Sequence, residues 1–181
     1  FFNKYRTLGD VGLYGIGASF GLALKLFLSA LEFAWTPFYL GIMREPNARQ
    51  IYSTLSTYLF ATLVVLGMTL SAVATDLVRL FTAPAFHGAA VVTPWIALGV
   101  MFQGVNLIGS IGLTITKRTT VYPLTTGLAA AVNVLANAVL VRRYGVMGAA
   151  WATALAYAAL AGVTVGFSWK AYPIHYEWSR L

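Results

Sequence analysis

Long apolar stretches separated by short polar gaps constrain the fold of this chain more than any other feature. A helix of about 20 apolar residues crosses the roughly 30 Å hydrocarbon layer of a membrane. Stretches that reach this length cover about residues 10–40, 51–80, 88–116, 120–141 and 146–169. They do not alternate with polar residues at a period of two, so membrane strands are not expected. We therefore predict an all-α, multi-pass bundle of about five spanning helices, with residues 1–181 forming one transmembrane unit.

Composition supports a membrane protein and excludes several other classes. Only 9% of the residues are charged, against about 25% in a typical soluble domain. The net charge is +7, but the basic residues come in ones and twos, and this pattern does not indicate a nucleic-acid partner. We expect them to lie at lipid headgroups. Six Lys/Arg fall on one side of the predicted membrane spans and five on the other, so this count leaves the orientation open. The absence of cysteine excludes disulfides and thiolate metal sites.

One face of the first stretch carries four polar residues. Lys25, Ser29, Glu32 and Thr36 are spaced by four, three and four, which places them on the same side of a helix. A charge at bilayer depth costs about 2.5–3.5 kcal/mol on insertion scales, so such residues seldom face lipid. Lys25 could hold an anionic substrate, and Glu32 could bind or release a proton or another cation. The alternative is that both charges pair with other helices or extend to an interface.

Two further stretches also carry polar residues on one side. Gln103, Asn106 and Ser110 are spaced by three and four, and Asn133 and Asn137 lie one turn apart. Such side chains either hydrogen-bond between helices or line a cavity. Three polar faces that meet around a hydrated groove suit a transporter better than a simple membrane anchor.

The last stretch carries small residues at four-residue steps, a spacing that lets two helix backbones approach closely. We predict that all of them serve helix packing. They are Ala150, Ala154, Ala158, Gly162 and Gly166.

Two segments resemble the C-terminal half of bacterial polysaccharide flippases, within the multidrug, oligosaccharidyl-lipid and polysaccharide exporter superfamily. The first is DVGLYGIGASFGLALKLFLSALEFAWTPF, in which residues 11–14 match the family's helix opening and residues 35–37 its close. The second is NVLANAVLVRRYGVMGAAWATALAY, from Asn133 to Tyr157. It resembles the junction between the last two helices, and the matching residues are Asn133, Asn137, Gly145, Gly148, Ala149, Ala150, Ala152 and Thr153.

The resemblance implies a protein of about twelve helices in two lobes around a central cavity that opens alternately to the two membrane faces. The five stretches would be helices eight to twelve, with FFNKYR at the end of helix seven and the C-terminal tail in the cytoplasm. The chain has no initiator Met and no signal-peptide pattern at its start, so we expect it to be the C-terminal part of a longer protein. An N-terminal lobe of the same protein would complete the cavity.

We therefore expect a flippase that moves undecaprenyl-diphosphate-linked oligosaccharide across the bacterial cytoplasmic membrane, for O-antigen of lipopolysaccharide, capsule or exopolysaccharide synthesis. Its partners would be this substrate, membrane lipids, the N-terminal lobe and a coupling ion, either proton or sodium. The residues expected to bind substrate or line the cavity are Lys25, Ser29, Glu32, Thr36, Gln103, Asn106, Asn133 and Asn137.

Three alternatives remain open at the level of sequence. They are a multidrug exporter of the same superfamily, a membrane enzyme acting on polyprenyl-linked sugars, and a structural membrane subunit. The enzyme is disfavoured because no gap supplies a large loop and no HExxH, GxSxG or phosphate-loop pattern occurs. We therefore expect no enzymatic activity, no cofactor and no metal site.

Overall fold

The computed structural model describes residues 8–172 and is helical throughout, with no strand in this range. Five helices are long and apolar enough to cross a membrane, which confirms the predicted all-α bundle and indicates a multi-pass membrane protein. The elements in chain order are α2 (Leu8–Gly41), α3 (Ala48–Phe81), the 3-10 helix η1 (Pro84–Val91), α4 (Thr93–Gly109), α5 (Ile111–Ile115), α6 (Val121–Tyr144) and α7 (Val146–Ala171).

The third spanning segment differs from its predicted bounds. The sequence predicted a span from residue 88, but Pro84–Val91 forms η1 and the spanning helix begins at Thr93. Pro94 lies in the first turn of α4, where a missing backbone N–H leaves no helical hydrogen bond unmade. The segment is also interrupted at Ser110, which separates α4 from the short α5.

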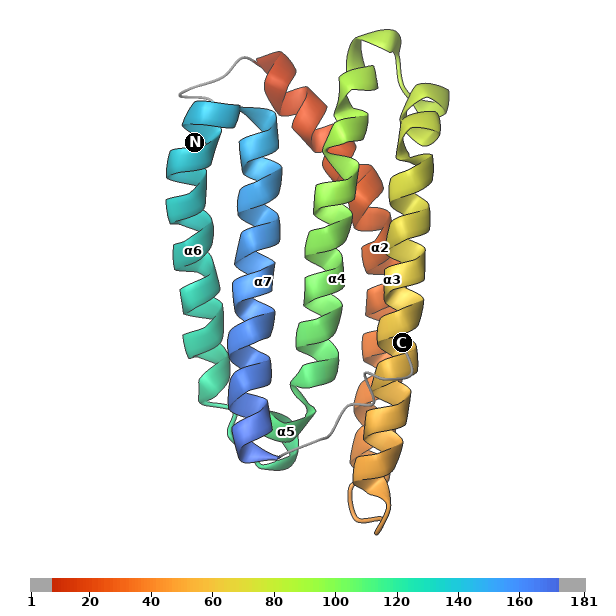
Figure 1. The fold of residues 1–181 in the computed structure, drawn as a ribbon, viewed down its shortest axis with the longest axis vertical. Coiled ribbons are helices and arrows are strands. Elements are labelled where there is room, and N and C mark those ends of the chain that lie inside the picture. The colour runs from red at the N-terminus through yellow and green to blue at the C-terminus, as the bar shows by residue number, and fades with distance from the viewer. Residues whose placement is uncertain (1–7, 173–181) are drawn as a thin grey trace.

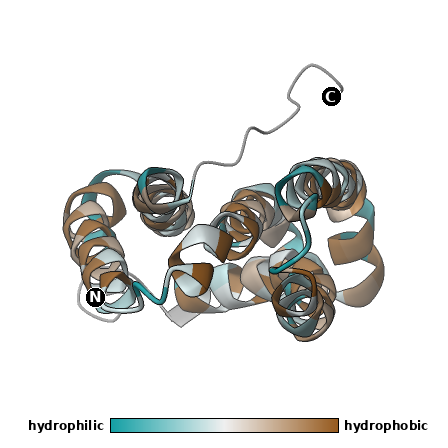
Figure 2. Cartoon of the chain, turned by 90° about the horizontal axis from the view of Figure 1, so that it is seen from below, coloured by the Kyte–Doolittle hydropathy of each residue, from teal (hydrophilic) through white to brown (hydrophobic). Residues whose placement is uncertain are grey.

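The helices run alternately up and down, as Figure 1 shows. One end of the bundle carries η1 and the α6–α7 turn, and the other carries α5 and the α2–α3 connection; we call these the η1 end and the α5 end. Helix α4 lies at the centre and packs against α2, α3 and α7. Apolar residues predominate along the helices in the view from the α5 end (Figure 2), as expected for surfaces that face lipid.

Helix α2 crosses the bundle at an angle, and the size of its packed side chains explains why. Near the η1 end, a Cβ on Gly17 would lie 2.7 Å from the Cβ of Val92, and one on Gly21 would lie 2.6 Å from that of Ile96. Only glycine permits this approach. Toward the α5 end the same side of α2 presents the buried residues Leu24, Leu28 and Trp35. The axis of α2 therefore diverges toward the α5 end (Figure 1).

The hydroxyl of Thr93 adds a polar link where α2 and α4 are closest. It is fully buried and donates a hydrogen bond of 3.0 Å to the carbonyl oxygen of Gly17. A hydrogen bond between helices in a membrane contributes about 0.6 kcal/mol on average and sometimes almost 2 kcal/mol. The link therefore supplements the packing at this point and does not replace it.

Helix α7 stays close to α4 and α5 along their common length. A Cβ on Gly99 would lie 3.1 Å from the ring of Tyr157. At the α5 end, the backbone N–H of Gly112 donates to the hydroxyl of Ser168 at 3.1 Å. The predicted small-residue stripe of α7 is only partly used, because Ala150 and Ala154 are buried but a Cβ on Gly162 or Gly166 would meet no atom within 4 Å.

An aromatic cluster joins α2 and α3 at the α5 end. Trp35 and Tyr39 of α2 pack with Tyr52 of α3 and with Ile108 and Ile111. The fully buried hydroxyl of Tyr52 donates a 2.6 Å hydrogen bond to the carbonyl oxygen of Tyr39. This carbonyl belongs to the last turn of α2, whose carbonyls have no partner within the helix. The bond therefore fixes the end of α2 against α3.

Replacing Gly21 by Leu should destabilise the bundle, because the new side chain would overlap Ile96. Overpacking of this kind costs about 1–3 kcal/mol. The matched control is Gly15→Leu, since Gly15 is exposed and a Cβ there meets nothing within 4 Å. Thermal melting of both variants in detergent should show a lower Tm for Gly21→Leu alone. Equal melting would contradict the close packing of α2 on α4.

Candidate functional site

The polar face of α2 contacts α7 near the η1 end and leaves it further along. Tyr14 and Ala18 precede Lys25 on this face and pack with Val92 and Ile96 of the η1–α4 segment and with Ala150 of α7. The hydroxyl of Tyr14 lies 3.3 Å from that of Thr153 on α7. Beyond this contact the divergence of α2 separates the two helices. A groove therefore opens between α2 on one side and α6 and α7 on the other.

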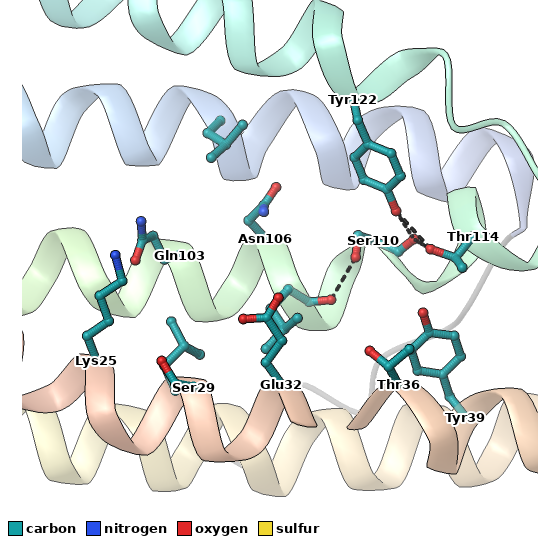
Figure 3. A pocket seen from close by; sticks show the side chains of 13 residues that line it. Lys25, Ser29, Glu32, Thr36, Tyr39, Gln103, Asn106, Ser110, Thr114 and Tyr122 are labelled. Atoms are coloured by element: carbon teal, nitrogen blue, oxygen red, sulfur yellow. Dashed lines mark hydrogen bonds between the residues drawn. The ribbon is translucent and has the colours of Figure 1, made fainter. Parts of the chain in front are cut away.

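This groove has a volume of about 460 Å³, within the range of small-molecule sites. Helices α2 and α4 supply most of its lining, and α5, α6 and α7 each supply one residue, as Figure 3 shows. The lining residues are Lys25, Leu28, Ser29, Glu32, Thr36, Tyr39, Gln103, Asn106, Leu107, Ser110, Thr114, Tyr122 and Leu160.

Six of the eight residues predicted to bind substrate or line a cavity lie around this one groove. All four polar residues of α2 are among them, and α4 contributes Gln103 and Asn106. Ser110, which shares their helix face, lies there as well. The side chains of α2 point toward α4 and α6 in Figure 3. Whether they contact a substrate remains a prediction.

The two predicted residues of α6, Asn133 and Asn137, do not line this groove. The side-chain N–H₂ of Asn137 donates to the backbone carbonyl of Asn133 at 2.9 Å and to its side-chain oxygen at 3.1 Å. The two asparagines therefore bond each other within α6. These bonds do not join α6 to another helix.

The groove reaches from the middle of the bundle to its α5 end. Lys25 has 17 residues of α2 before it and 16 after it, and Gln103 has 10 residues of its span before it and 12 after it. Both therefore lie near the middle of helices that are long enough to span a membrane. Glu32 follows Lys25 by seven residues, which corresponds to about 10 Å along the axis at 1.5 Å per residue. The groove thus lies in the half of the bundle nearer the α5 end.

The charges in this groove have no protein partner within residues 8–172. Lys25 and Glu32 are exposed and form no ion pair or hydrogen bond with described residues. The side-chain oxygen of Asn106 is buried and also has no hydrogen-bond partner in this part of the chain. Unpaired polar groups are costly away from water. The groove is therefore suited to water or a polar ligand and not to lipid tails.

A hydroxyl network forms the α5 end of the groove. The phenol of Tyr122 lies 2.8 Å from the hydroxyl of Thr114 and donates to the carbonyl oxygen of Ser110 at 3.4 Å. The hydroxyl of Ser110 donates to the carbonyl oxygen of Leu107 at 2.8 Å. The Ser110 hydroxyl thus gives the Leu107 carbonyl a partner at the α4–α5 break, while the Ser110 carbonyl also accepts backbone bonds from Leu113 and Thr114. The bonds of Tyr122 hold the first turn of α6 beside α5.

Sequence reasoning missed the aromatic members of the groove. Tyr39 was detectable, because it follows Lys25 by 14 residues, close to four helical turns, on the side adjacent to the polar face. Tyr122 gave no such signal. Its place depends on how α6 packs after the turn at residues 116–120, and local spacing carries no information about that.

No family model, curated protein or solved structure matches this chain. The chemistry of the groove must therefore be inferred from its own residues. Within residues 8–172 there is no group of three or more His, Cys, Asp or Glu side chains that could hold a metal ion. The groove offers a cation, a carboxylate, amides and hydroxyls, which together can bind a polar molecule.

The hydration of the groove can be tested with single cysteines, since the chain has none of its own. Ser29 lines the groove, whereas Ser19 is exposed on another side of α2 and bonds its own helix. Each lies at a comparable distance from its nearer end of α2, with 11 residues before Ser19 and 12 after Ser29. The thiolate is the form of cysteine that attacks a maleimide, and it is disfavoured in apolar surroundings.

With the reagent present on both sides of the membrane, a hydrophilic maleimide should therefore label Ser29→Cys much faster than Ser19→Cys. Labelling after denaturation in detergent controls for expression of both variants. Equal labelling of the two variants would show that the groove is not selectively hydrated.

Proposed function

We propose that this chain forms the C-terminal lobe of a flippase for lipid-linked oligosaccharides in the bacterial cytoplasmic membrane. The observation that carries the proposal is an unpaired lysine near the middle of a membrane-length helix, in a polar groove that opens toward one end of the bundle. A simple membrane anchor does not need such a groove, and the enzyme alternative lacks both a large loop and a known catalytic pattern. In this proposal no bond is broken, and the N-terminal lobe completes the cavity.

The groove chemistry supports an anionic, amphipathic substrate. The ammonium group of Lys25 is a compact charge that attracts phosphate oxygens, and Gln103 lies beside it at the same depth. The diphosphate would bind at this point while the polyprenyl chain stays in lipid. Glu32, about 10 Å nearer the α5 end, would bind the coupling proton or sodium ion or adjust the field at Lys25.

The family resemblance implies an orientation with the α5 end in the cytoplasm, and the basic residues within 8–172 agree with it. Among the described residues 8–172, three basic residues lie at the η1 end, namely Arg79, Arg142 and Arg143. Five lie at the α5 end, namely Arg44, Arg49, Lys117, Arg118 and Lys170. Lys and Arg near membrane helices favour the cytoplasmic side. In this orientation the groove faces the leaflet from which the substrate would be taken.

Replacing Lys25 by Ala should reduce surface polysaccharide roughly tenfold or more, because a charge-assisted contact contributes about 1.5–3 kcal/mol. Lys117→Ala, at the bundle end, is the control and should leave polysaccharide unchanged. Quantitative sugar blotting of whole cells gives the readout, and immunoblotting of membranes checks protein amount. Wild-type polysaccharide in Lys25→Ala cells would refute the role of Lys25.

One observation favours a multidrug exporter as the second candidate. Glu32 shares the groove with the rings of Tyr39 and Tyr122, and carboxylates and aromatic rings attract organic cations. In that case Glu32→Gln should sensitise cells to cationic dyes several-fold while Lys25→Ala does not. The flippase proposal instead expects Lys25→Ala to lose surface polysaccharide and both variants to keep wild-type sensitivity to the dyes. Inhibitory dye concentrations for both variants separate the two functions.

A further inference from the structure

The α5 end of the groove differs in chemistry from its middle. The middle holds the charged side chains, whereas the α5 end is lined by the two tyrosines Tyr39 and Tyr122 and the hydroxyls of Thr36, Ser110 and Thr114. These five side chains are neutral. Tyr39 and Tyr122 come from opposite walls, α2 and α6, as Figure 3 shows.

Packing on both walls holds the tyrosines in place. Tyr39 is only 6% exposed, and its ring lies edge-on to Trp35 with centroids 6.2 Å apart. The hydroxyl of Tyr52 fixes the Tyr39 backbone. On the other wall, the phenol of Tyr122 is held by Thr114 and by the carbonyl oxygen of Ser110. Groups fixed before binding lose little entropy when a ligand arrives.

Neutral hydroxyls and aromatic rings suit a polyhydroxylated ring better than an ion. Hydroxyls both donate and accept hydrogen bonds, and a tyrosine offers an apolar face together with a polar tip. Thr36 follows Lys25 by 11 residues, which is about 16 Å along α2. This separation leaves room for a head group that extends beyond a phosphate bound at Lys25.

We propose that the α5 end of the groove is a carbohydrate subsite, in which Tyr39, Tyr122 and Thr36 contact neutral sugar rings of a ligand whose anionic group lies at Lys25. The subsite rests on the proposed flippase function, because it assigns the glycan part of the same ligand. It also sets the direction of that ligand, with the phosphate deep in the membrane and the sugars toward the α5 end.

The test measures sugar and anion binding separately on the full protein in phospholipid nanodiscs, because maltoside detergents would themselves compete for a sugar site. Saturation-transfer NMR measures binding of maltose, lactose and N,N′-diacetylchitobiose. Calorimetry measures binding of inorganic pyrophosphate. The test variants are Tyr122→Phe and Thr36→Val. The hydroxyl of Thr36 has no hydrogen-bond partner within residues 8–172, so its loss should not disturb the fold.

Matched controls come from α3, where Tyr58 and Thr62 are exposed away from the groove. Tyr58→Phe and Thr62→Val should bind every probe as the wild type does. Tyr122→Phe and Thr36→Val should each weaken binding of at least one disaccharide roughly three- to tenfold, as expected for a lost hydrogen bond, and leave pyrophosphate affinity unchanged. Lys25→Ala should weaken pyrophosphate binding and leave disaccharide affinity unchanged.

Two results would overturn the subsite while the proposed function stands. One is pyrophosphate binding that depends on Lys25 without binding of any of the three disaccharides. The other is disaccharide binding that neither Tyr122→Phe nor Thr36→Val weakens. If the wild type bound neither pyrophosphate nor any disaccharide, both the subsite and the proposed anion site would fail.

Discussion

The close contact of α2 with the η1–α4 segment at Gly17 and Gly21 is the interaction on which the groove depends. Two glycines one turn apart bring the helix backbones together near the η1 end, and the bulkier Leu24, Leu28 and Trp35 keep α2 farther from α4 beyond it. Helix α7 follows α4 closely along its length. One helix diverges while the other does not, so a wedge opens between them at the α5 end.

This geometry gives the intramembrane charges a place that lipid cannot offer. The face of α2 that carries Tyr14 is used for helix contact near the η1 end. The same face carries Lys25 and Glu32 where the helices have separated. The charges therefore point into a groove with amides and hydroxyls around it. Water or a polar ligand in that groove would offset their cost in an apolar bundle, and for this reason the proposed function centres on Lys25.

The structure also changed the meaning of several sequence patterns. Asn133 and Asn137 share a helix face as predicted, but they bond each other within α6. Gly162 and Gly166 continue the small-residue stripe of α7 without packing against any described helix. A spacing of four residues fixes which side chains share a face. It does not state which neighbour, if any, that face meets.

The sequence by itself determined the five membrane-length helices and the polar faces of α2 and α4, because helix formation in lipid follows from apolar length and because helical periodicity is local. It also placed Lys25 near the middle of the first of these helices, since its position along the chain fixes its place within α2. Only the tertiary structure decided that the two polar faces meet in one groove, that this groove ends at the α5 side, and that Tyr122 closes its far wall. These features depend on the crossing of α2 over α4 and on the turn before α6, which set distances between residues far apart in the chain.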